Sequence, residues 1–245
     1  MRSAAAAAVL LALPAFGGGA RAEDTDLLLA LAADVSRSID EGEFELQRKG
    51  YAAALSDPRV LAAIRGGTNG TIAVCFLEWS GAGEQMVVAD WVVIRDGEDA
   101  GGLSATLLAA PRSFIGRTSI SGAIDFAMER FAAAKIHANR RIIDISGDGT
   151  NNSGRPVTDA RDQALAEGVT INGLAIINER PNPGYTFHTQ PPGGLPDWYR
   201  QNVIGGPGAF LHVVEDFRSF ADAMTNKLVS EIAGRTPAEP NTALR

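Results

Sequence analysis

The segment Asp34-Val35-Ser36-Arg37-Ser38 places one carboxylate and two hydroxyls at alternate positions. It directly follows residues 27–33, an unbroken apolar run that is typical of a fully buried, central parallel strand. In an open α/β sheet, ligands bind in the crevice at the carboxyl ends of such strands. Carboxylate and hydroxyl oxygens suit Mg²⁺, which takes near-octahedral oxygen coordination and keeps some of its waters.

The same segment also has a purely structural interpretation. Ser38 and Glu41 match a capping box, in which the serine accepts a backbone N–H at the start of a helix and the glutamate returns to the serine backbone. These five residues alone do not distinguish helix capping from metal binding. Evidence from other segments of the chain is needed.

Two other segments place oxygen donors at similar points. Thr118 lies in the segment 116–124, in the loop that leads into a stretch with apolar residues at helical spacing. Asp148 lies between two glycines at the end of a short apolar strand that begins near Ile142. We therefore expect one divalent ion on one rim of the sheet, held by Asp34, Ser36, Ser38, Thr118 and Asp148.

Together, these segments resemble the metal-ion-dependent adhesion site (MIDAS) of von Willebrand factor type A (vWA) domains. That family has Asp-x-Ser-x-Ser after the first strand, a threonine in a Gly-x-Thr loop and an Asp-Gly after the fourth strand. The resemblance covers most of residues 26–233, and the chain is similar to the uncharacterised secreted bacterial DUF1194 group. One departure is Gly147, which stands where the family usually has a threonine before the aspartate.

The resemblance implies that the hydroxyls contact the ion directly or nearly so, while the two aspartates often act through water. One coordination position is left for an acidic residue of the ligand. Two carboxylates would neutralise Mg²⁺, Mn²⁺ or Ca²⁺, and neutral hydroxyls would leave the ion able to attract an incoming carboxylate. The expected function is a binding module whose partner is a protein, or another ligand, that presents an acidic group.

An enzyme is the competing interpretation. A metal-assisted hydrolase could use Ser36 or a metal-bound water, and phosphoryl transfer through Asp34 could use Arg37 or Arg117 near the phosphate. An activated serine needs an adjacent base, however, and no histidine lies in the three segments, so we expect no histidine beside the site. A third interpretation, a structural domain whose Asp and Ser only cap helices, predicts no metal dependence.

The three histidines and the single cysteine do not indicate any other chemistry. His137, His188 and His212 are scattered, without the clustered nitrogen or sulfur ligands typical of catalytic zinc. We expect His212 to be an ordinary strand residue. Cys75, within a predicted strand, is expected to be a buried small hydrophobe, and a lone cysteine forms no intrachain disulfide.

The N-terminal residues 1–22 predict a signal peptide, with Arg2, an apolar core at 4–13 and Ala20-Arg21-Ala22 before the cleavage point. The core is shorter than the ~20 residues that span a bilayer. Removing Arg2 and Arg21 from the 22 basic residues leaves 20 against 29 acidic ones, a net charge of −9. So acidic a chain disfavours nucleic acid as a partner. We expect a protein exported to the periplasm or the medium, with no later membrane span.

The predicted domain is a single vWA-like unit over 23–235, followed by a disordered tail over 236–245. Strands alternate with helices, which favours a doubly wound, mostly parallel α/β sheet with helices on both faces. The run at 85–94 follows the strand at 71–79 too closely for a crossover, which predicts an antiparallel edge strand. The other predicted strands are 27–33, 142–145, 169–177 and 210–214, and the predicted helices include 43–55, 102–110, 158–167 and 216–232.

The segment 178–208 contains six prolines and several aromatic residues, and it follows a parallel strand, so it emerges on the rim of the predicted metal site. Long loops in a compact domain are commonly functional. The aromatics either contribute to a partner surface or anchor the loop, with Trp198 and Tyr199 on a short helix; both interpretations stay open. The sequence leaves the oligomeric state open as well.

Overall fold

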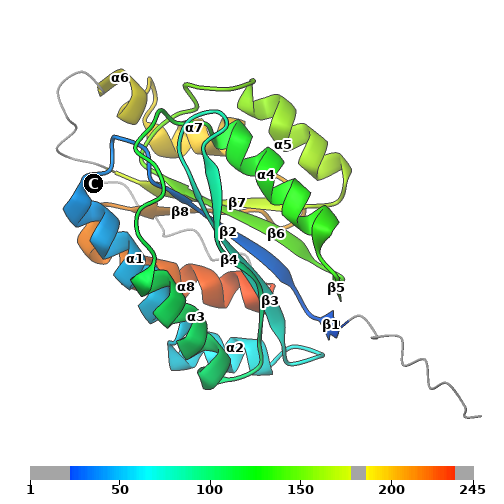
Figure 1. Cartoon of the computed structure of the whole chain (residues 1–245). Helices are drawn as coiled ribbons and strands as arrows, with labels where there is room; N and C mark the ends of the chain where they lie inside the picture. The colour runs from blue at the N-terminus through cyan, green and yellow to red at the C-terminus, as the bar shows by residue number, and fades with distance from the viewer. Residues whose placement is uncertain (1–22, 178–185, 235–245) are drawn as a thin grey trace, which may run out of the picture.

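The computed structural model describes residues 23–177 and 186–234, which form a central sheet between two layers of helices (Figure 1). The six strands lie in the order β4-β3-β2-β6-β7-β8, and only β4 is antiparallel to its neighbour. This confirms the predicted doubly wound sheet with an antiparallel edge. The strands are β2 (Leu28–Asp34), β3 (Ile72–Trp79), β4 (Gln85–Ile94), β6 (Arg141–Gly147), β7 (Thr170–Ile176) and β8 (Leu211–Val214).

The side of the sheet to which the chain adds successive strands changes at β2. From β2 the chain adds β3 and β4 on one side, and then adds β6, β7 and β8 on the other. The carboxyl ends of β2 and β6 therefore meet at the switch point, with Ala33 opposite Ser146 in the parallel register. This is the crevice where open α/β sheets bind ligands, and the strand ends deliver Asp34 and Asp148 to it.

Every residue of β2 is buried because helices cover both faces of the sheet. Leu29 and Leu31 contribute to the core beneath α1 and α8, whereas Ala30 and Ala32 contribute to the opposite core beneath α4 and α5. The first layer holds α1 (Glu41–Leu55), α2 (Pro58–Arg65), α3 (Gly97–Ala109) and α8 (Phe220–Ala233), and the second holds α4 (Ile120–Ala133), α5 (Val157–Ala166) and α7 (Leu195–Asn202) (Figure 1).

The cap of α1 differs from the one the sequence suggested. Asp40, not Ser38, is the N-cap: its Oδ1 accepts the Glu43 N–H at 2.8 Å, and Glu43 Oε2 accepts the Asp40 N–H at 2.8 Å. The aspartate is two residues nearer the helix and completes the box with Glu43. Ser38 is thereby released from capping, and its hydroxyl faces the Asp148 carboxylate instead.

Several smaller elements were not anticipated. The chain adds α2 after α1, and β1 (Glu23–Thr25) pairs in parallel with β5 (Ile136–Ala138) as a separate two-stranded sheet. A 3₁₀ turn, η1 (Phe217–Ser219), precedes α8, and a short helix, α6 (Thr186–Thr189), follows β7.

The structure also tests the predictions for His212, Cys75 and the aromatic residues of the 178–208 loop. His212 lies in β8 and Cys75 is fully buried, both as predicted, and burial raises the pKa of the Cys75 thiol to about 12. Tyr199 is fully buried on α7, which supports the anchoring interpretation for this residue. The predicted signal peptide, the tail 236–245 and the first part of the 178–208 loop lie outside the described residues. In the described part of the chain, no helix has the length and apolar character needed to cross a bilayer.

Candidate metal centre

The structure brings together the side chains of all five predicted ligands, although they come from three separate segments. Side-chain oxygens of four of them, Asp148, Ser38, Ser36 and Thr118, form a continuous chain of contacts. Asp148 Oδ1 accepts the Ser38 hydroxyl at 2.6 Å, and Ser38 Oγ lies 3.1 Å from Ser36 Oγ. The Thr118 hydroxyl lies 3.2 Å from Ser36 Oγ. These four residues and Asp34 are all at most 5% exposed.

Asp34 is held by its own loop. Its Oδ1 accepts the Ser36 N–H at 2.7 Å, whereas its Oδ2 is buried and has no hydrogen-bond partner in the described part of the chain. Burial raises the pKa of Asp34 well above its ordinary value, and the nearby Asp148 carboxylate raises it further. A buried, like-charged pair of this kind is stabilised by a cation.

The donor set fits a hard divalent ion. An octahedron with bonds of about 2.1 Å has edges of about 3 Å, and the oxygen separations in the chain of contacts are close to that value. Within residues 23–177 and 186–234, no three His, Cys, Asp or Glu side chains form a group that could hold a metal ion. Any ion at this site would therefore depend on the hydroxyls as much as on the carboxylates.

Gly147, the residue that departs from the vWA pattern, is explained by a close neighbour. A Cβ at this position would stand 2.8 Å from Tyr199 Oη and 2.9 Å from Asp34 Oδ2. Tyr199 is fully buried on α7, and its hydroxyl has no hydrogen-bond partner among the described residues. The larger threonine of the family pattern would meet the phenol, so the glycine and Tyr199 fit each other.

His188, on α6, reaches the site and contradicts the expectation that no histidine lies beside it. Its Nε2 lies 2.9 Å from Thr118 Oγ1, and its Nδ1 lies 3.1 Å from Thr150 Oγ1. A Cβ on Gly149 would stand 2.2 Å from Nε2, so this glycine makes room for the imidazole. Burial and the Arg117 guanidinium lower the pKa of His188 to about 4, which keeps the ring neutral near neutral pH.

Backbone hydrogen bonds tie the three loops together. The Arg37 N–H donates to the Gly116 carbonyl at 3.0 Å, and the Ser119 N–H donates to the Ser80 carbonyl at 2.7 Å. Thr118 is paired twice with Asn152, because its N–H donates to Asn152 Oδ1 at 3.0 Å and its carbonyl accepts the Asn152 N–H at 2.9 Å. The hydroxyl of Thr118 is thus positioned by the segment that follows Asp148.

Arg112 supports the loop that carries Asp34 and the two serines. Its guanidinium donates to the carbonyls of Val35, Ser36 and Ile39 at 2.9, 2.9 and 2.8 Å. A single side chain therefore satisfies three carbonyls that have turned away from the sheet. The sequence pattern did not single out Arg112, because an arginine in a loop carries no signal of what it binds.

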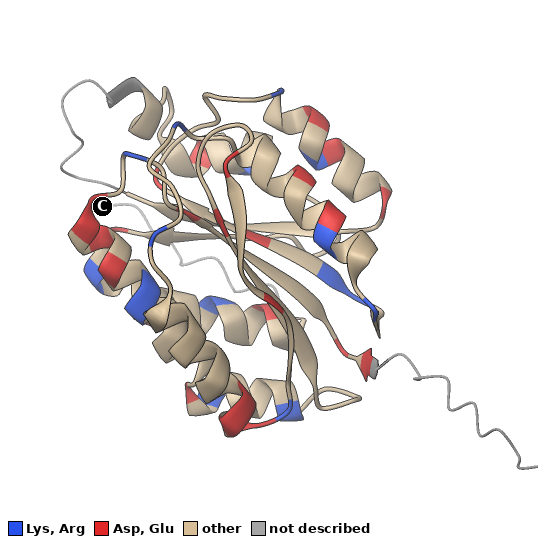
Figure 2. Cartoon of the chain, viewed as in Figure 1, with Lys and Arg blue, Asp and Glu red and all other residues tan. Residues whose placement is uncertain are grey.

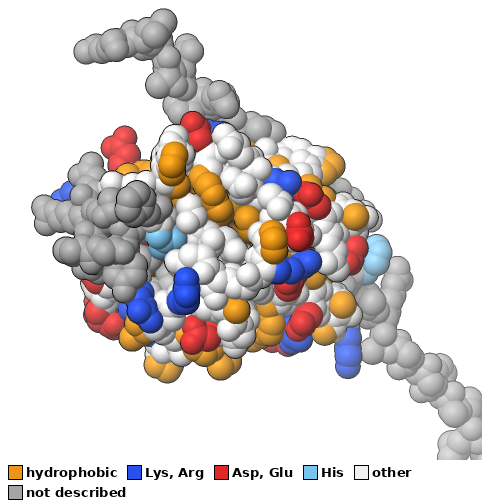
Figure 3. Space-filling model, turned by 90° about the horizontal axis from the view of Figure 1, so that it is seen from above, with side chains coloured by type: hydrophobic (Ala, Val, Ile, Leu, Met, Phe, Trp, Pro, Cys, Tyr) orange, Lys and Arg blue, Asp and Glu red, His pale blue; other side chains and the backbone are white. Residues whose placement is uncertain are grey.

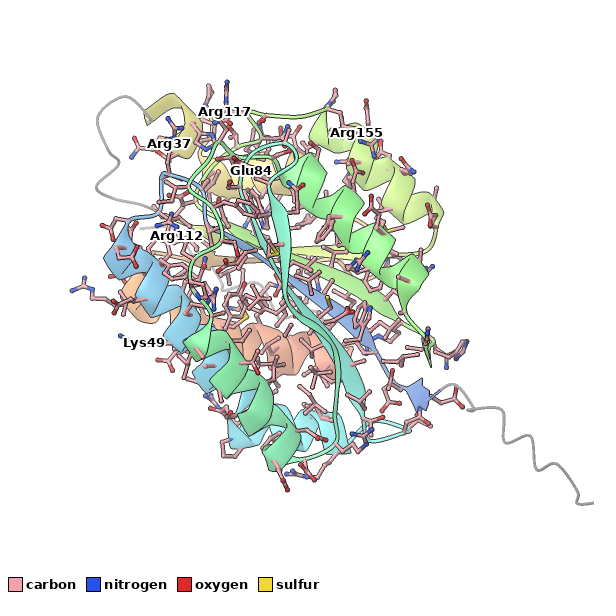
Figure 4. All side chains as sticks on the ribbon, viewed as in Figure 1. Arg37, Lys49, Glu84, Arg112, Arg117 and Arg155 are labelled. Carbon is pink, nitrogen blue, oxygen red and sulfur yellow. The ribbon has the colours of Figure 1, made fainter. Side chains whose placement is uncertain are left out.

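The site opens into a cavity of about 350 Å³. Arg37 and Arg117 are exposed at its mouth, and within the described residues neither forms an ion pair. Figure 4 shows both on the loops above the sheet, with Arg112 beneath them, and Figure 2 shows basic residues on these loops. Seen from above, this face carries basic side chains near a histidine (Figure 3). The cavity is lined by Arg37, Ser38, Gly116, Arg117, Thr118, Asn152 and His188.

Several solved structures resemble this fold. Proximal thread matrix protein 1 from the mussel byssus, in a structure described as having a zinc-occupied MIDAS motif, is 19% identical with a TM-score of 0.62. The match covers 86% of this chain and 49% of that one. A vWA protein from Catenulispora acidiphila is 13% identical with a TM-score of 0.60, covering 85% of this chain and 43% of that one.

The pilus adhesin SpaC from Lactobacillus rhamnosus GG is similar as well, with 14% identity and a TM-score of 0.60 over 85% of this chain and 30% of the adhesin. The chain thus spans about half the length of these proteins or less. At such identities the likeness shows the vWA fold alone. A search of curated proteins finds no match. The model of the DUF1194 family, described as a protein of unknown function, matches residues 24–236, and the chain therefore belongs to this family.

Proposed function

We propose that this protein is an exported binding module that holds one divalent cation and uses it to engage an acidic group of a protein or other ligand. The observation that carries the proposal is the meeting of three loops at one buried point beneath an open cavity. The proposed metal-binding residues are Asp34, Ser36, Ser38, Thr118 and Asp148.

The hydroxyls and the carboxylates would have different roles at the ion. The three hydroxyls would contact the ion while adding no charge, and the two carboxylates would balance its two positive charges. The unpartnered Asp34 Oδ2 would accept a hydrogen bond from a water on the ion. When bound, Mg²⁺, Mn²⁺ or Ca²⁺ would supply a coordination position for an incoming carboxylate. The zinc-occupied MIDAS motif of the mussel protein supports a divalent ion in this fold.

The mouth of the cavity favours an anionic ligand. The whole sequence carries a net charge of −7, yet the exposed charged residues that line this cavity are Arg37 and Arg117. A local positive field on an acidic protein attracts acidic partners and repels basic ones. The arginines would contact the part of the ligand that surrounds the carboxylate on the metal.

Affinity capture tests the binding function. Immobilised wild-type protein should retain a partner from envelope extract in Mg²⁺ and release it on chelation. Asp34→Asn, which removes a buried charge with little change in volume, should retain none in either condition. Asp162→Asn, at an exposed position on α5, is the matched control and should behave as wild type. Equal retention in Mg²⁺ and in chelator would contradict the proposal.

The proposed export rests on residues 1–22. Mass spectrometry of periplasmic or culture-medium protein should find a chain that begins at Glu23. An intact Met1 in that material would contradict the proposed cleavage.

One observation favours an enzyme as the second candidate. His188 lies 2.9 Å from the Thr118 hydroxyl, and Thr150 holds its other nitrogen, an arrangement that can activate a hydroxyl. Purified protein would then hydrolyse a phosphate or acyl ester with metal present and lose this activity in Thr118→Val and His188→Gln. The absence of turnover, combined with metal-dependent capture, would favour the binding module.

A further inference from the structure

We infer that His188 is a nitrogen ligand of the metal at this site, which shifts the site's preference from Mg²⁺ toward ions that imidazole suits, such as Zn²⁺. This inference rests on the proposed metal site and adds a donor from outside the three sequence segments. Three observations support it: the position of the imidazole, the contact of its second nitrogen and the space that Gly149 leaves for the ring.

The position of Nε2 continues the chain of oxygen donors. Its 2.9 Å separation from Thr118 Oγ1 is close to the octahedral edge of about 3 Å. Thr118 Oγ1 is in turn 3.2 Å from Ser36 Oγ. Nε2, Thr118 Oγ1, Ser36 Oγ, Ser38 Oγ and Asp148 Oδ1 therefore follow one another as a row of donors, and together they would hold one ion.

The second nitrogen is arranged as in metal-binding histidines, where the nitrogen away from the metal is fixed by a hydrogen bond. His188 Nδ1 lies 3.1 Å from Thr150 Oγ1. With the proton on Nδ1, this contact is a hydrogen bond donated to the Thr150 hydroxyl, and the lone pair of Nε2 faces the site. The Thr150 N–H also donates to the His188 carbonyl at 3.0 Å, which fixes the backbone.

The imidazole fits only because residue 149 is a glycine. A Cβ there would stand 2.2 Å from Nε2 and 2.5 Å from Cε1, so any other residue would push the ring away from the site. The Asp-Gly of the third segment thus serves two purposes: it supplies the carboxylate and makes room for the nitrogen donor.

A nitrogen donor has a chemical consequence. Imidazole suits Zn²⁺ and other first-row transition ions, whereas Mg²⁺ and Ca²⁺ prefer oxygen donors. A site of oxygens alone also binds Zn²⁺ more tightly than Mg²⁺ in general, so the informative quantity is the ratio of the two affinities and its change when the nitrogen is removed.

Pulsed EPR of bound Mn²⁺ tests the nitrogen directly. Wild-type protein should show ¹⁴N coupling to the ion, and His188→Gln, which substitutes an amide for the imidazole, should lose it. His137→Ala removes an exposed histidine in β5 and is the matched control that should keep the coupling. Bound Mn²⁺ without ¹⁴N coupling in the wild type would overturn the inference and leave the proposed function intact.

Calorimetry provides the second readout. His188→Gln should lower the ratio of Zn²⁺ to Mg²⁺ affinity by about tenfold or more, with the thermal midpoint of the metal-free protein confirming that the variant folds. An unchanged ratio would overturn the inference. If wild-type protein binds none of these ions, both the inference and the proposed function fail.

Discussion

At the scale of single residues, the candidate site depends on neutral hydroxyls placed between two buried carboxylates. Sequence spacing predicted that these five side chains would lie together, because alternate positions after a buried strand share one face and an Asp-Gly at a strand end reaches the same rim. It did not predict His188, which is 70 residues from Thr118 along the chain. The only available signal was that the 178–208 loop emerges on this rim, which does not specify which of its residues turns inward.

The contribution of one hydroxyl is measurable with Thr118→Val, which keeps charge and shape but removes a donor. We expect metal affinity to fall about tenfold, or about 1.4 kcal/mol, because one oxygen of the set is lost. Isothermal titration with Mg²⁺ and Mn²⁺ measures the change. Thr106→Val, at an exposed position on α3, should bind as wild type. Equal affinity in both variants would show that Thr118 is not a ligand.

At the scale of elements, two arginines with little exposure, Arg48 and Arg112, position the loops that carry the proposed ligands. Arg112 satisfies three carbonyls in the loop after β2. Arg48, on α1, pairs with the buried Glu78 on β3, and Glu78 Oε2 accepts the Ser113 N–H at 2.9 Å. Helix α1, strand β3 and the loop before Thr118 are thereby joined. The sequence predicted the helices and strands from their apolar patterns but not these arginine contacts, because they depend on loop conformation.

Replacing Arg112 by methionine keeps most of the apolar stem and leaves the carbonyls of Val35, Ser36 and Ile39 without their donor. We expect the free energy of unfolding to fall by about 1–3 kcal/mol, and metal affinity to fall as well, because the ligand loop loses its support. Urea denaturation and metal titration measure the two effects. Arg59→Met, on the exposed face of α2, should change neither by more than about 0.5 kcal/mol. Unchanged metal affinity in Arg112→Met would contradict the positioning role.

A second element-scale feature is the buried charge cluster where α8 packs on the sheet. Lys227 contacts both Glu231 and Asp144, with Nζ 2.7 Å from Asp144 Oδ1, and Asn172 Nδ2 donates to Glu231 Oε1 at 2.8 Å. Burial, together with the Asp144 carboxylate, raises the pKa of Glu231 to about 7. Burial also raises the pKa of Asp144, and it lowers that of the nearby His212.

The sign of the pH effect follows from this shift. Because the pKa of Glu231 rises from 4.5 to about 7 on folding, the native state holds an extra proton between these values. The contribution of Glu231 to the free energy of unfolding is therefore greatest at low pH and is lost as pH rises toward 7. Glu231→Gln removes the titration, so its stability relative to wild type should increase from pH 5 to pH 8 in urea denaturation. A constant or decreasing difference would contradict the raised pKa.

At the scale of the whole molecule, the order of strands decides where the site lies. The reversal between β2 and β6 creates the crevice, and alternating helices bury both faces of the sheet. This architecture was predictable because unbroken apolar runs separated by helical patterns admit few other arrangements. The separate β1–β5 pair was not predictable, because three-residue strands carry too little pattern.

Metal binding should stabilise the entire fold, since its ligands come from three segments that are far apart along the chain. At a concentration of ion one hundred times the dissociation constant, we expect about 2.7 kcal/mol of added stability, provided that the unfolded chain does not bind. Thermal unfolding with Mg²⁺ or Mn²⁺ against chelator measures the shift, and Asp34→Asn should show none. A shift of the same size in Asp34→Asn would place the ion elsewhere.

The most direct test of the central claim is anomalous diffraction from crystals grown with Mn²⁺. We expect one strong anomalous peak at the switch point of the sheet, about 2.1 Å from the hydroxyl oxygens of Ser36, Ser38 and Thr118. The two carboxylates should lie within direct or water-mediated reach of the same peak. A well-ordered site at saturating Mn²⁺ with no peak among these oxygens would contradict the proposal that this chain holds a metal ion there.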